Sequence, residues 1–510
     1  YPENCNKRGL GWNFDSNFLL LLLSVASYLL YKWATYTHDF FAKRGVPYER
    51  PWPLLGNNLD IIRKKESMFS SILKTYQKSK SHKIYGVFNF RAPIFVVNDP
   101  ELIKKIAIKD FDHFPNHSLL FPTNNDKMLH NMLSIMKDQR WKSMRNTLSP
   151  VFTAAKMRAM FSLMNECFVE CSSYLHKLPK NAGNGVELEL KQCFTRLSND
   201  LIASTAFGLK INSYENIDNE FYRIGQTLID FRGKQMLKFT LASVAPKLMK
   251  AEKTDYFLRL VVDAMKYREE HKIVRPDMIQ LLMEAKKESM ENWSDIELVA
   301  QCFVFFFAAY ENNANVICTT CHELLRNPDV QQRLYEEVIE MHTQLKGAPL
   351  GYDDLSKLKY MDMVVSESLR YWSLAPFTDR ECSKDYTLRD EDDNVVVEFK
   401  VGDKIWFPIF GLHRDEKYFE NPDKFDPERF SAENKHAINA SAYLPFGVGP
   451  RICIGNRYAL MQAKAMLYYL VLEFKLESST KTSHNLLKDI RGFQKNPEKG
   501  FWAKLVPTAR

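Results

Sequence analysis

The chain has 510 residues, of which 45% are hydrophobic, and carries a formal net charge of +8. This is ample material for a large buried core, and no Gly/Ser linker, charge block or repeat divides it, so we expect one large domain. No basic stripe interleaved with aromatic residues is present, which argues against nucleic acid as a partner. The nine scattered cysteines do not suggest a disulfide framework. The charge excess reflects either a solvated surface or a basic patch for an acidic partner or an anionic membrane.

The first predicted element is a membrane anchor in residues 1–36. Residues 18–31 read FLLLLLSVASYLLY, and with the flanking aromatic residues the segment approaches the ~20 residues that cross a bilayer. A cleaved signal peptide would need small residues directly after the apolar run, where Tyr31-Lys32-Trp33 stands instead. The flanking positive charges give a modest preference for a cytosolic main body; they are Lys7, Arg8, Lys32, Lys43, Arg44 and Arg50.

Residues 37–60 predict a stiff, extended connector, because Pro47, Pro51 and Pro53 block helix continuation. Residues 61–510 then form the globular domain. It opens with two short β patterns between Lys83 and Val97, which predict a hairpin. Helical periodicity dominates residues 128–210, and short β patterns recur around residues 394–401. The fold class is therefore mainly α with a minor β part.

The longest predicted helix runs from Ser294 to about Arg326. A capping-box sequence opens it, Asn327-Pro328 stops it, and its length is on the order of 50 Å. Its middle, FVFFFAAY, is apolar all round and should be buried. Glu311 follows, with three asparagines at positions 312, 313 and 315. A buried carboxylate is costly without a role, so Glu311 either marks a functional site or lies on a wet face of the helix.

The strongest signal is the segment from Phe446 to Gly455, FGVGPRICIG, which carries Cys453. Glycines and proline make a tight turn before the cysteine, and a helical pattern follows it. The sulfur therefore lies near a helix N-terminus, which favours a thiolate, and Phe446 can shield it. A buried structural cysteine is the alternative, but the spacing F-x-x-G-x-R-x-C-x-G is highly specific.

This segment resembles the cysteine signature of the cytochrome P450 family, and the resemblance continues from the proline connector to the C-terminal helix. It implies a cytochrome P450 fold with an N-terminal transmembrane helix, haem b as cofactor and Cys453 as the iron ligand. Glu367-Ser-Leu-Arg370 resembles the family's E-x-x-R pair, and Arg429 resembles the arginine that joins it. Trp141 and Arg145 resemble the family's contacts to the haem propionates, for which Arg451 and Arg380 are further expected partners.

The central helix departs from the family's A-G-x-[DE]-T motif, since it reads Ala308-Ala-Tyr-Glu311-Asn312. The acid is kept, but asparagine replaces the threonine that serves oxygen activation and proton relay in the family. Two enzyme classes stay open. One is a monooxygenase in which Glu311, Asn312 and water relay protons. The other is a haem-thiolate enzyme that isomerises or dehydrates peroxides without needing O₂. A third class, a binding protein without turnover, conflicts with the intact cysteine loop and E-x-x-R pair.

The resemblance is to microsomal members, including insect members that act on lipophilic foreign compounds. It implies a lipophilic substrate, with a pocket lined by residues 114–129, 207–250 and 303–311. It also implies electrons from NADPH through a membrane-bound NADPH–cytochrome reductase, with cytochrome b5 as a second candidate donor. The expected location is the endoplasmic reticulum membrane, with the catalytic domain in the cytosol. A basic docking face would include Lys137, Arg140 and Lys142, because flavoprotein partners are acidic.

One motif points elsewhere. Cys318-Thr-Thr-Cys321-His322 matches the C-x-x-C-H pattern of covalent haem attachment. It lies inside the long helical pattern, and we interpret it as a chance match between ordinary helix residues.

Overall fold

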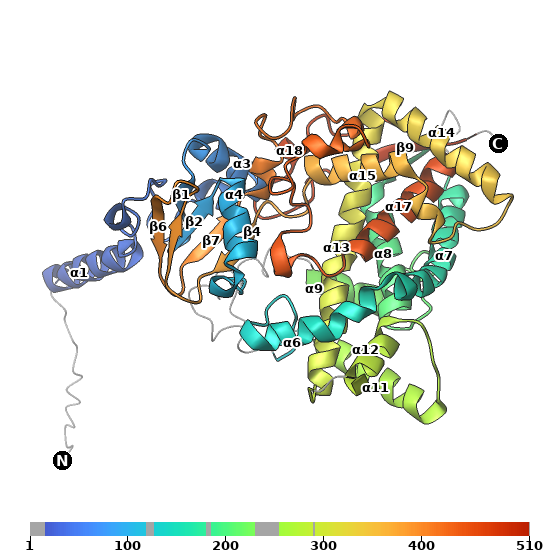
Figure 1. Ribbon diagram of the computed structural model, residues 1–510, viewed down its shortest axis with the longest axis horizontal. Coiled ribbons are helices and arrows are strands. Elements are labelled where there is room, and N and C mark those ends of the chain that lie inside the picture. Colours follow the sequence, from blue (N-terminus) through green and yellow to red (C-terminus); the bar gives the residue numbers. More distant parts are fainter. Residues whose placement is uncertain (1–15, 119–126, 180–184, 230–253, 289–290, 509–510) are drawn as a thin grey trace, which may run out of the picture.

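The computed structural model describes residues 16–118, 127–179, 185–229, 254–288 and 291–508, and it is mainly α-helical with a minor β part, as predicted (Figure 1). The longer helices are α1 (Ser16–Thr35), α3 (Met68–Ser79), α6 (Asp138–Leu148), α7 (Ala154–Lys177), α8 (Leu190–Ala206), α9 (Glu220–Ile229), α11 (Thr254–His271), α12 (Met278–Glu288), α13 (Asp295–Arg326), α14 (Pro328–Leu345), α15 (Lys359–Tyr371) and α17 (Asn456–Glu473). The short ones are α2 (Leu59–Ile62), α4 (Pro100–Lys104), α5 (Lys127–His130), α16 (Ile409–Leu412) and α18 (Leu486–Asp489).

Within the described residues, the strands form three small sheets. They are β1 (Ile84–Asn89), β2 (Ala92–Val97), β3 (Val186–Glu189), β4 (Thr378–Glu381), β5 (Tyr386–Arg389), β6 (Val395–Phe399), β7 (Lys404–Phe407), β8 (Phe474–Glu477) and β9 (Trp502–Pro507). The largest sheet has the order β1-β2-β7-β4, in which β1 and β2 make the predicted antiparallel hairpin and β7 runs parallel to β2. The other sheets have the orders β3-β9-β8 and β5-β6.

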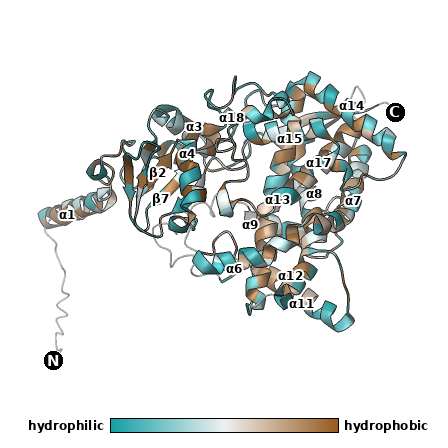
Figure 2. Ribbon diagram, viewed as in Figure 1, coloured by the Kyte–Doolittle hydropathy of each residue, from teal (hydrophilic) through white to brown (hydrophobic). Residues whose placement is uncertain are grey.

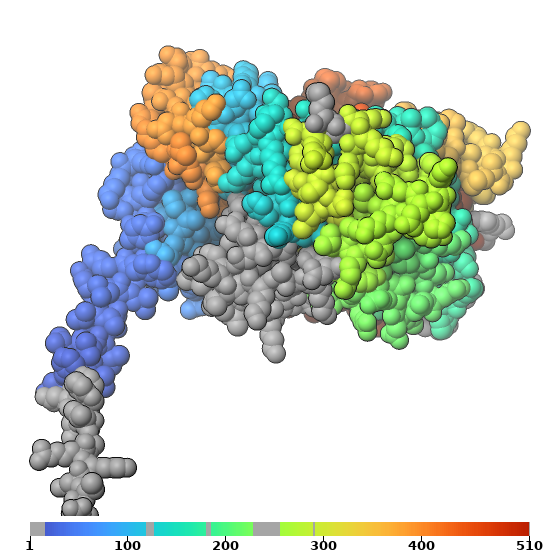
Figure 3. Space-filling view, turned by 90° about the horizontal axis from the view of Figure 1, so that it is seen from below, coloured from blue at the N-terminus to red at the C-terminus, as the bar shows by residue number. Residues whose placement is uncertain are grey.

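The N-terminal helix α1 is long and apolar enough to cross a membrane, with a hydropathy of 1.5 over its best window. Only 6% of that window is buried, so its leucines lie exposed. Figures 2 and 3 show α1 extending away from the globule, beyond the four-stranded sheet. This arrangement fits the predicted membrane anchor.

The proline-rich segment after α1 packs onto the four-stranded sheet. Phe41 and Val46 are buried in the core of that sheet. Gly56 has a φ of 59°, and a Cβ there would lie 2.3 Å from the carbonyl oxygen of Phe88. Only glycine allows the chain to pass so close to β1. The segment is therefore held against the globule by side-chain burial and by backbone fit.

Helix α13 is the central element of the helical part (Figure 1). Its N-terminus has the predicted cap, since the backbone N–H and the hydroxyl of Ser294 both donate to a carboxylate oxygen of Glu297, at 2.9 and 2.6 Å. It contacts α8, α11, α15 and α17, which bury most of its circumference. A 32-residue helix of this kind forms because its apolar surface is covered on nearly all sides.

The helical region predicted for residues 128–210 is interrupted by strand β3, which the periodicity did not indicate. Val186 of β3 pairs with Leu505 of β9, close to the C-terminus. A four-residue strand has too few residues for a period-2 pattern. Its partner lies more than three hundred residues away in sequence, so only the tertiary structure specifies this pairing.

A fully buried ion pair joins α15 to the segment before the cysteine loop. Arg370 donates through Nε and Nη2 to the two carboxylate oxygens of Glu367, at 2.7 and 2.8 Å. Its Nη1 donates to the carbonyl oxygen of His413, at 2.7 Å, and Arg429 lies 3.5 Å from the same carboxylate. Breaking such a pair costs about 3–5 kcal/mol, because one charge is left buried without its partner.

His413 is built into this cluster as a neutral ring. Its Nδ1 contacts the carbonyl oxygen of Arg370 at 3.2 Å, and its Nε2 accepts from the backbone N–H of Leu444 at 2.8 Å. Burial, followed by repulsion from Arg370, lowers the pKa of His413 to about 3. Protonation of Nε2 would turn this acceptor into a donor. The hydrogen bond from the backbone N–H of Leu444, just before the cysteine loop, would then break.

We predict a stability loss in acid that traces to His413. The unfolded chain takes up a proton on this ring near its ordinary pKa of 6.5, whereas the folded chain does not until pH falls to about 3. The contribution of His413 is therefore complete above pH 6.5 and decreases by about 1.4 kcal/mol per pH unit below it. Thermal unfolding of wild type and His413→Asn at pH 7.5 and 5.5 measures this, and the variant should show the smaller drop. His436→Asn, at an exposed histidine, should keep the wild-type drop; an identical drop in His413→Asn would contradict the assignment.

Candidate functional site

The cysteine loop approaches the π-helical turn Lys105–Lys109, which follows α4. The approach is so close that one glycine of the cysteine loop is required. Gly447 and Gly449 have φ values of 82° and 71°, in the region that side chains rarely adopt. A Cβ at Gly449 would lie 2.1 Å from the carbonyl oxygen of Ala107. The loop closes when the N–H of Cys453 donates to the carbonyl oxygen of Phe446, at 2.9 Å. The sulfur then lies three residues before the start of α17.

The Cys453 side chain is exposed, yet protein surrounds it closely enough that burial is the main influence on its thiol. The two observations agree if the sulfur faces an internal hollow rather than bulk solvent. Burial raises the pKa of the thiol, while the N–H of Gly455 and the charge of Arg145 lower it. These two groups favour the thiolate, and a metal ion on the sulfur would complete its deprotonation.

Three arginines, Arg145, Arg380 and Arg451, lie near one another beside the cysteine loop, and the nearby carboxylates are too few to neutralise them. Burial lowers the pKa of Arg451 to about 9, and repulsion from Arg380 and Arg145 lowers it further. Burial also lowers the pKa of Arg380 to about 10, and its Nε has no hydrogen-bond partner among the described residues. Asp379 is the acid beside Arg380, and it already accepts from Ser118 and His117.

The four predicted propionate contacts lie in two groups. Trp141 and Arg145 are one turn apart on α6, and the guanidinium of Arg451 lies 3.8 Å from the centre of the Trp141 ring. Arg451 also donates to the carbonyl oxygens of Pro115 and Met136, at 2.7 and 2.9 Å, so part of its role is to tie the loop to the segment before α6. Arg380 projects from β4 and donates to the carbonyl oxygen of Val448, at 2.6 Å.

This donor set fits a group that carries carboxylates and a metal ion. The Arg145 guanidinium makes no hydrogen bond with another described residue, and the buried Nε of Arg380 also has no partner among them. Two carboxylates would satisfy these donors and neutralise the excess positive charge. The thiolate of Cys453 would hold the metal ion of such a group.

The predicted pair on α13 is held by residues that the sequence did not single out. An oxygen of Glu311 accepts from Asn496 Nδ2 at 2.7 Å and lies 3.9 Å from Lys191 Nζ. Asn312 donates through Nδ2 to the carbonyl oxygen of Ala308, at 2.8 Å, and its Oδ1 accepts from Lys495 Nζ at 3.3 Å. No sequence pattern marks Lys191, Lys495 or Asn496, because nothing local shows that α8 and the C-terminal loop meet here.

The face of α13 that carries Asn312 lies close to the cysteine loop. Ala308, one turn before Asn312, is exposed although most of the helix is buried. Phe305, on the same face, packs against Phe152 with ring centres 5.2 Å apart, and Phe152 lies 4.0 Å from the Cβ position of Gly455. Phe152 therefore links this face of α13 to the end of the cysteine loop.

Comparison with known proteins identifies the family. The family model "Cytochrome P450" matches residues 46–503. The chain is 56% identical to "Cytochrome P450 9b2" of Drosophila melanogaster, over 96% of this chain and 99% of that protein. It is 53% identical to "Cytochrome P450 9b1" of the same species, over 96% and 98%. It is 32% identical to "Cytochrome P450 3A11" of Mus musculus, over 96% of each chain.

The chain belongs to the cytochrome P450 family. It is therefore a haem- and iron-binding oxidoreductase of the monooxygenase type, similar to insect members. The predicted fold class and family resemblance are confirmed. Parts of the predicted substrate-lining stretches, residues 119–126 and 230–253, lie outside the described residues.

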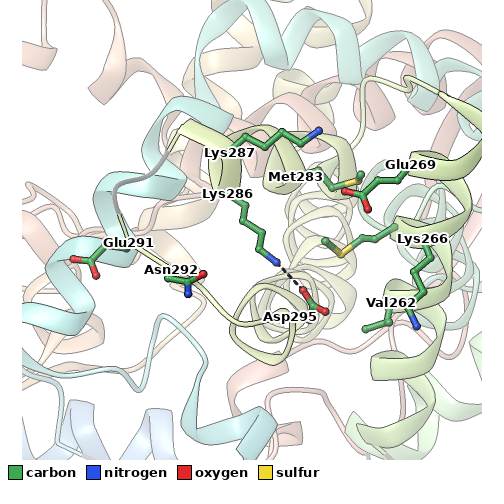
Figure 4. A pocket seen from close by; sticks show the side chains of 10 residues that line it. Val262, Lys266, Glu269, Met283, Lys286, Lys287, Glu291, Asn292 and Asp295 are labelled. Atoms are coloured by element: carbon green, nitrogen blue, oxygen red, sulfur yellow. Dashed lines mark hydrogen bonds and ion pairs between the residues drawn. The ribbon is translucent and has the colours of Figure 1, made fainter.

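Two other features of this P450 do not belong to the site. Cys318 and Cys321 are fully buried inside α13, where burial raises the pKa of both thiols, so they are not placed to react with a haem. A cavity of about 550 Å³ lies between α11, α12 and the start of α13, with charges of both signs on its wall (Figure 4). Its wall includes Asp295, which is about 24 Å from Glu311 along the helix.

We predict that Gly449→Ala reduces haem retention more than a matched glycine change. It adds a Cβ at positive φ and a clash with the carbonyl of Ala107. Gly402→Ala adds only the positive-φ strain, about 1–2 kcal/mol, since nothing lies within 4 Å of its Cβ position. Haem content per protein, measured after purification, should fall in Gly449→Ala and stay near wild type in Gly402→Ala. Equal haem contents in the two variants would show that the close approach is unimportant.

We also predict that Cys453→Ala abolishes the thiolate-type absorption of the reduced, carbon monoxide-bound protein. Cys382→Ala is the control, because Cys382 is buried and its thiol donates only to the backbone carbonyl of Lys384. It should keep the thiolate-type spectrum. A Cys453→Ala variant that retains this spectrum would rule out Cys453 as the ligand.

Proposed function

We propose that this P450 inserts one atom of O₂ into a lipophilic substrate, using electrons that NADPH supplies through a membrane-bound reductase. The observation that carries the proposal is the connected set of Lys191, Glu311, Asn496, Asn312 and Lys495 on the haem-side face of α13. Three of these groups carry exchangeable protons on ionisable atoms. A monooxygenase needs such a proton supply, whereas an enzyme that only rearranges peroxides does not need net proton delivery.

Each site residue has a distinct proposed role. Cys453 Sγ ligates the iron, and Phe446 shields the sulfur from water. Trp141, Arg145, Arg380 and Arg451 bind the haem carboxylates. Bound haem with a thiolate ligand supplies O₂ activation and transfer of an oxygen atom into a C–H bond.

Glu311 and Asn312 serve the proton supply. Glu311 takes up and releases a proton through water, while the amide N–H of Asn496 and the ammonium group of Lys191 hold its carboxylate in place. Asn312 uses one amide N–H in the bond to Ala308 and keeps the other free to orient a water. Thr319 and Thr320 of the same helix also donate to the carbonyl four residues earlier. A threonine at position 312 would therefore keep the bond to Ala308, and the asparagine reproduces its geometry without its hydroxyl.

The membrane and redox partners follow from surface features. Helix α1 anchors the enzyme in the endoplasmic reticulum membrane with its catalytic domain in the cytosol. Of the charges expected to favour that orientation, Lys7 and Arg8 lie outside the described residues. In the basic face, Lys137 pairs with Glu381 and Arg140 with Glu297, so Lys142 is the most available cation for reductase or cytochrome b5.

A second function class remains because position 312 is an asparagine. Isomerising or dehydrating an organic peroxide does not require the hydroxyl that is missing here. A haem-thiolate enzyme of that class needs neither NADPH nor O₂. The two classes differ in the co-reactants they consume, so one reconstitution experiment separates them.

We predict NADPH- and O₂-dependent oxygenated product when the enzyme is reconstituted with a microsomal reductase and a panel of lipophilic compounds. In Asn312→Thr the product formed per NADPH consumed should rise by a few-fold, because a hydroxyl both donates and accepts and can turn its proton from the Ala308 carbonyl toward a water, whereas an amide N–H cannot relay a proton. Asn313→Thr, at the neighbouring position of α13, is the control, because the Asn313 side chain is bonded to Gln462 and not to Ala308, Lys191 or Lys495. A parallel sample receives only an organic hydroperoxide. Isomerised hydroperoxide without NADPH, and no oxygenation across the panel, would favour the second class.

A further inference from the structure

The loop between α18 and β9 places a lysine, Lys495, beside the haem-side face of α13. The loop is closed at its base by the β-bridge between Ile490 and Pro497 and by the N–H of Glu498, which donates to the carbonyl oxygen of Asp489 at 3.0 Å. Gly492 is bridged to Ser67 at the start of α3. Both ends of the loop are thus fixed, so the position of Lys495 is set before any ligand binds.

Lys495 is a cation without an anion of its own. Its ammonium group donates to the neutral amide oxygen of Asn312, at 3.3 Å, and no ion pair within 4 Å involves it among the described residues. The nearest acid, Glu311, is already held by Asn496 and lies 3.9 Å from Lys191. Glu189, the other acid near Lys191, accepts backbone N–H groups of Lys191, Gln192 and Phe501 instead. Two ammonium groups therefore face one available carboxylate.

The Lys495 side chain is accessible to solvent although it lies deep within the protein. It is exposed, yet protein surrounds it, and burial lowers the pKa of its ammonium group despite attraction to Glu311. Cys453 shows the same combination of exposure and burial. Exposed Ala308, one turn before Asn312, lies on the same helix face. An unneutralised cation in such a place favours an anionic ligand, because little water competes for it.

We propose that Lys495 binds the carboxylate of an amphipathic substrate, so that this enzyme prefers lipophilic carboxylic acids over neutral compounds of the same length. The inference rests on the proposed function, since it names the substrate class of the same site. The apolar body of the acid lies along the α13 face that carries Val304, Phe305 and Ala308, which are half-buried or exposed. The carboxylate accepts a charge-assisted hydrogen bond from Nζ and balances the second ammonium group.

The test is equilibrium binding to the full-length haem protein, without reductase, NADPH or turnover. Dodecanoic acid, methyl dodecanoate and dodecan-1-ol are titrated into wild type, Lys495→Met, Lys495→Arg and Lys499→Met. The readouts are the ligand-induced shift of the haem absorption and the heat of binding. Lys499 is the matched control, because it is an exposed lysine four residues further along the same loop.

Wild type and Lys499→Met should bind the acid about 10- to 100-fold more tightly than the ester or the alcohol, the range of one hydrogen bond between charged groups. Lys495→Met should lose this preference while binding the ester as wild type does, and Lys495→Arg should retain most of it. Equal affinities for acid and ester in wild type, or an unchanged preference in Lys495→Met, would overturn the inference. Because binding precedes turnover, an acid preference without NADPH-dependent product would refute only the proposed function. Oxygenation of neutral compounds without an acid preference would refute only the inference.

Discussion

Cys453 lies where burial raises the pKa of its thiol, and the loop that carries it opposes this effect with an N–H from Gly455 and the nearby charge of Arg145. This opposition explains several features that otherwise look unrelated. The chain must bend at Gly447 and Gly449 to aim the sulfur inward. The loop must be fixed from behind, which Arg370 and neutral His413 do by bonding to each other and to Leu444. In a flexible loop the sulfur would not stay beside the Gly455 N–H and Arg145, which favour the metal-binding thiolate.

Positive charge is the second organising feature of the site. Arg145, Arg380 and Arg451 lie close enough to repel one another, which costs stability unless carboxylates bind among them. Lys495, beside α13, is likewise a cation without a neutralising acid of its own. In both places the protein holds cations that its own acids do not neutralise. We propose that ligand carboxylates complete the charge balance, from the cofactor in one place and from the substrate in the other.

The asparagine at position 312 keeps the shape of the helix, and in the proposed function it changes how protons reach this site. It makes the same bond to the carbonyl four residues earlier that Thr319 and Thr320 make elsewhere in α13. The lost hydroxyl is offset by ionisable neighbours, since Lys191, Glu311 and Lys495 surround the asparagine. Neighbouring lysines and a carboxylate can deliver protons through water even where the helix itself offers only an amide.

The amino-acid sequence by itself determined the features that depend on local pattern. The cysteine loop, the capping box of α13, the β1–β2 hairpin and the apolar α1 are each encoded within about thirty consecutive residues, so spacing and periodicity reveal them. The family resemblance added the candidate haem contacts, including Arg380 on a strand too short to predict. Only the tertiary structure brought Lys191, Asn496 and Lys495 to the two predicted residues of α13, and paired β3 with β9. These contacts join segments one hundred to three hundred residues apart, and no local preference of the chain specifies which distant side chain will lie opposite Asn312.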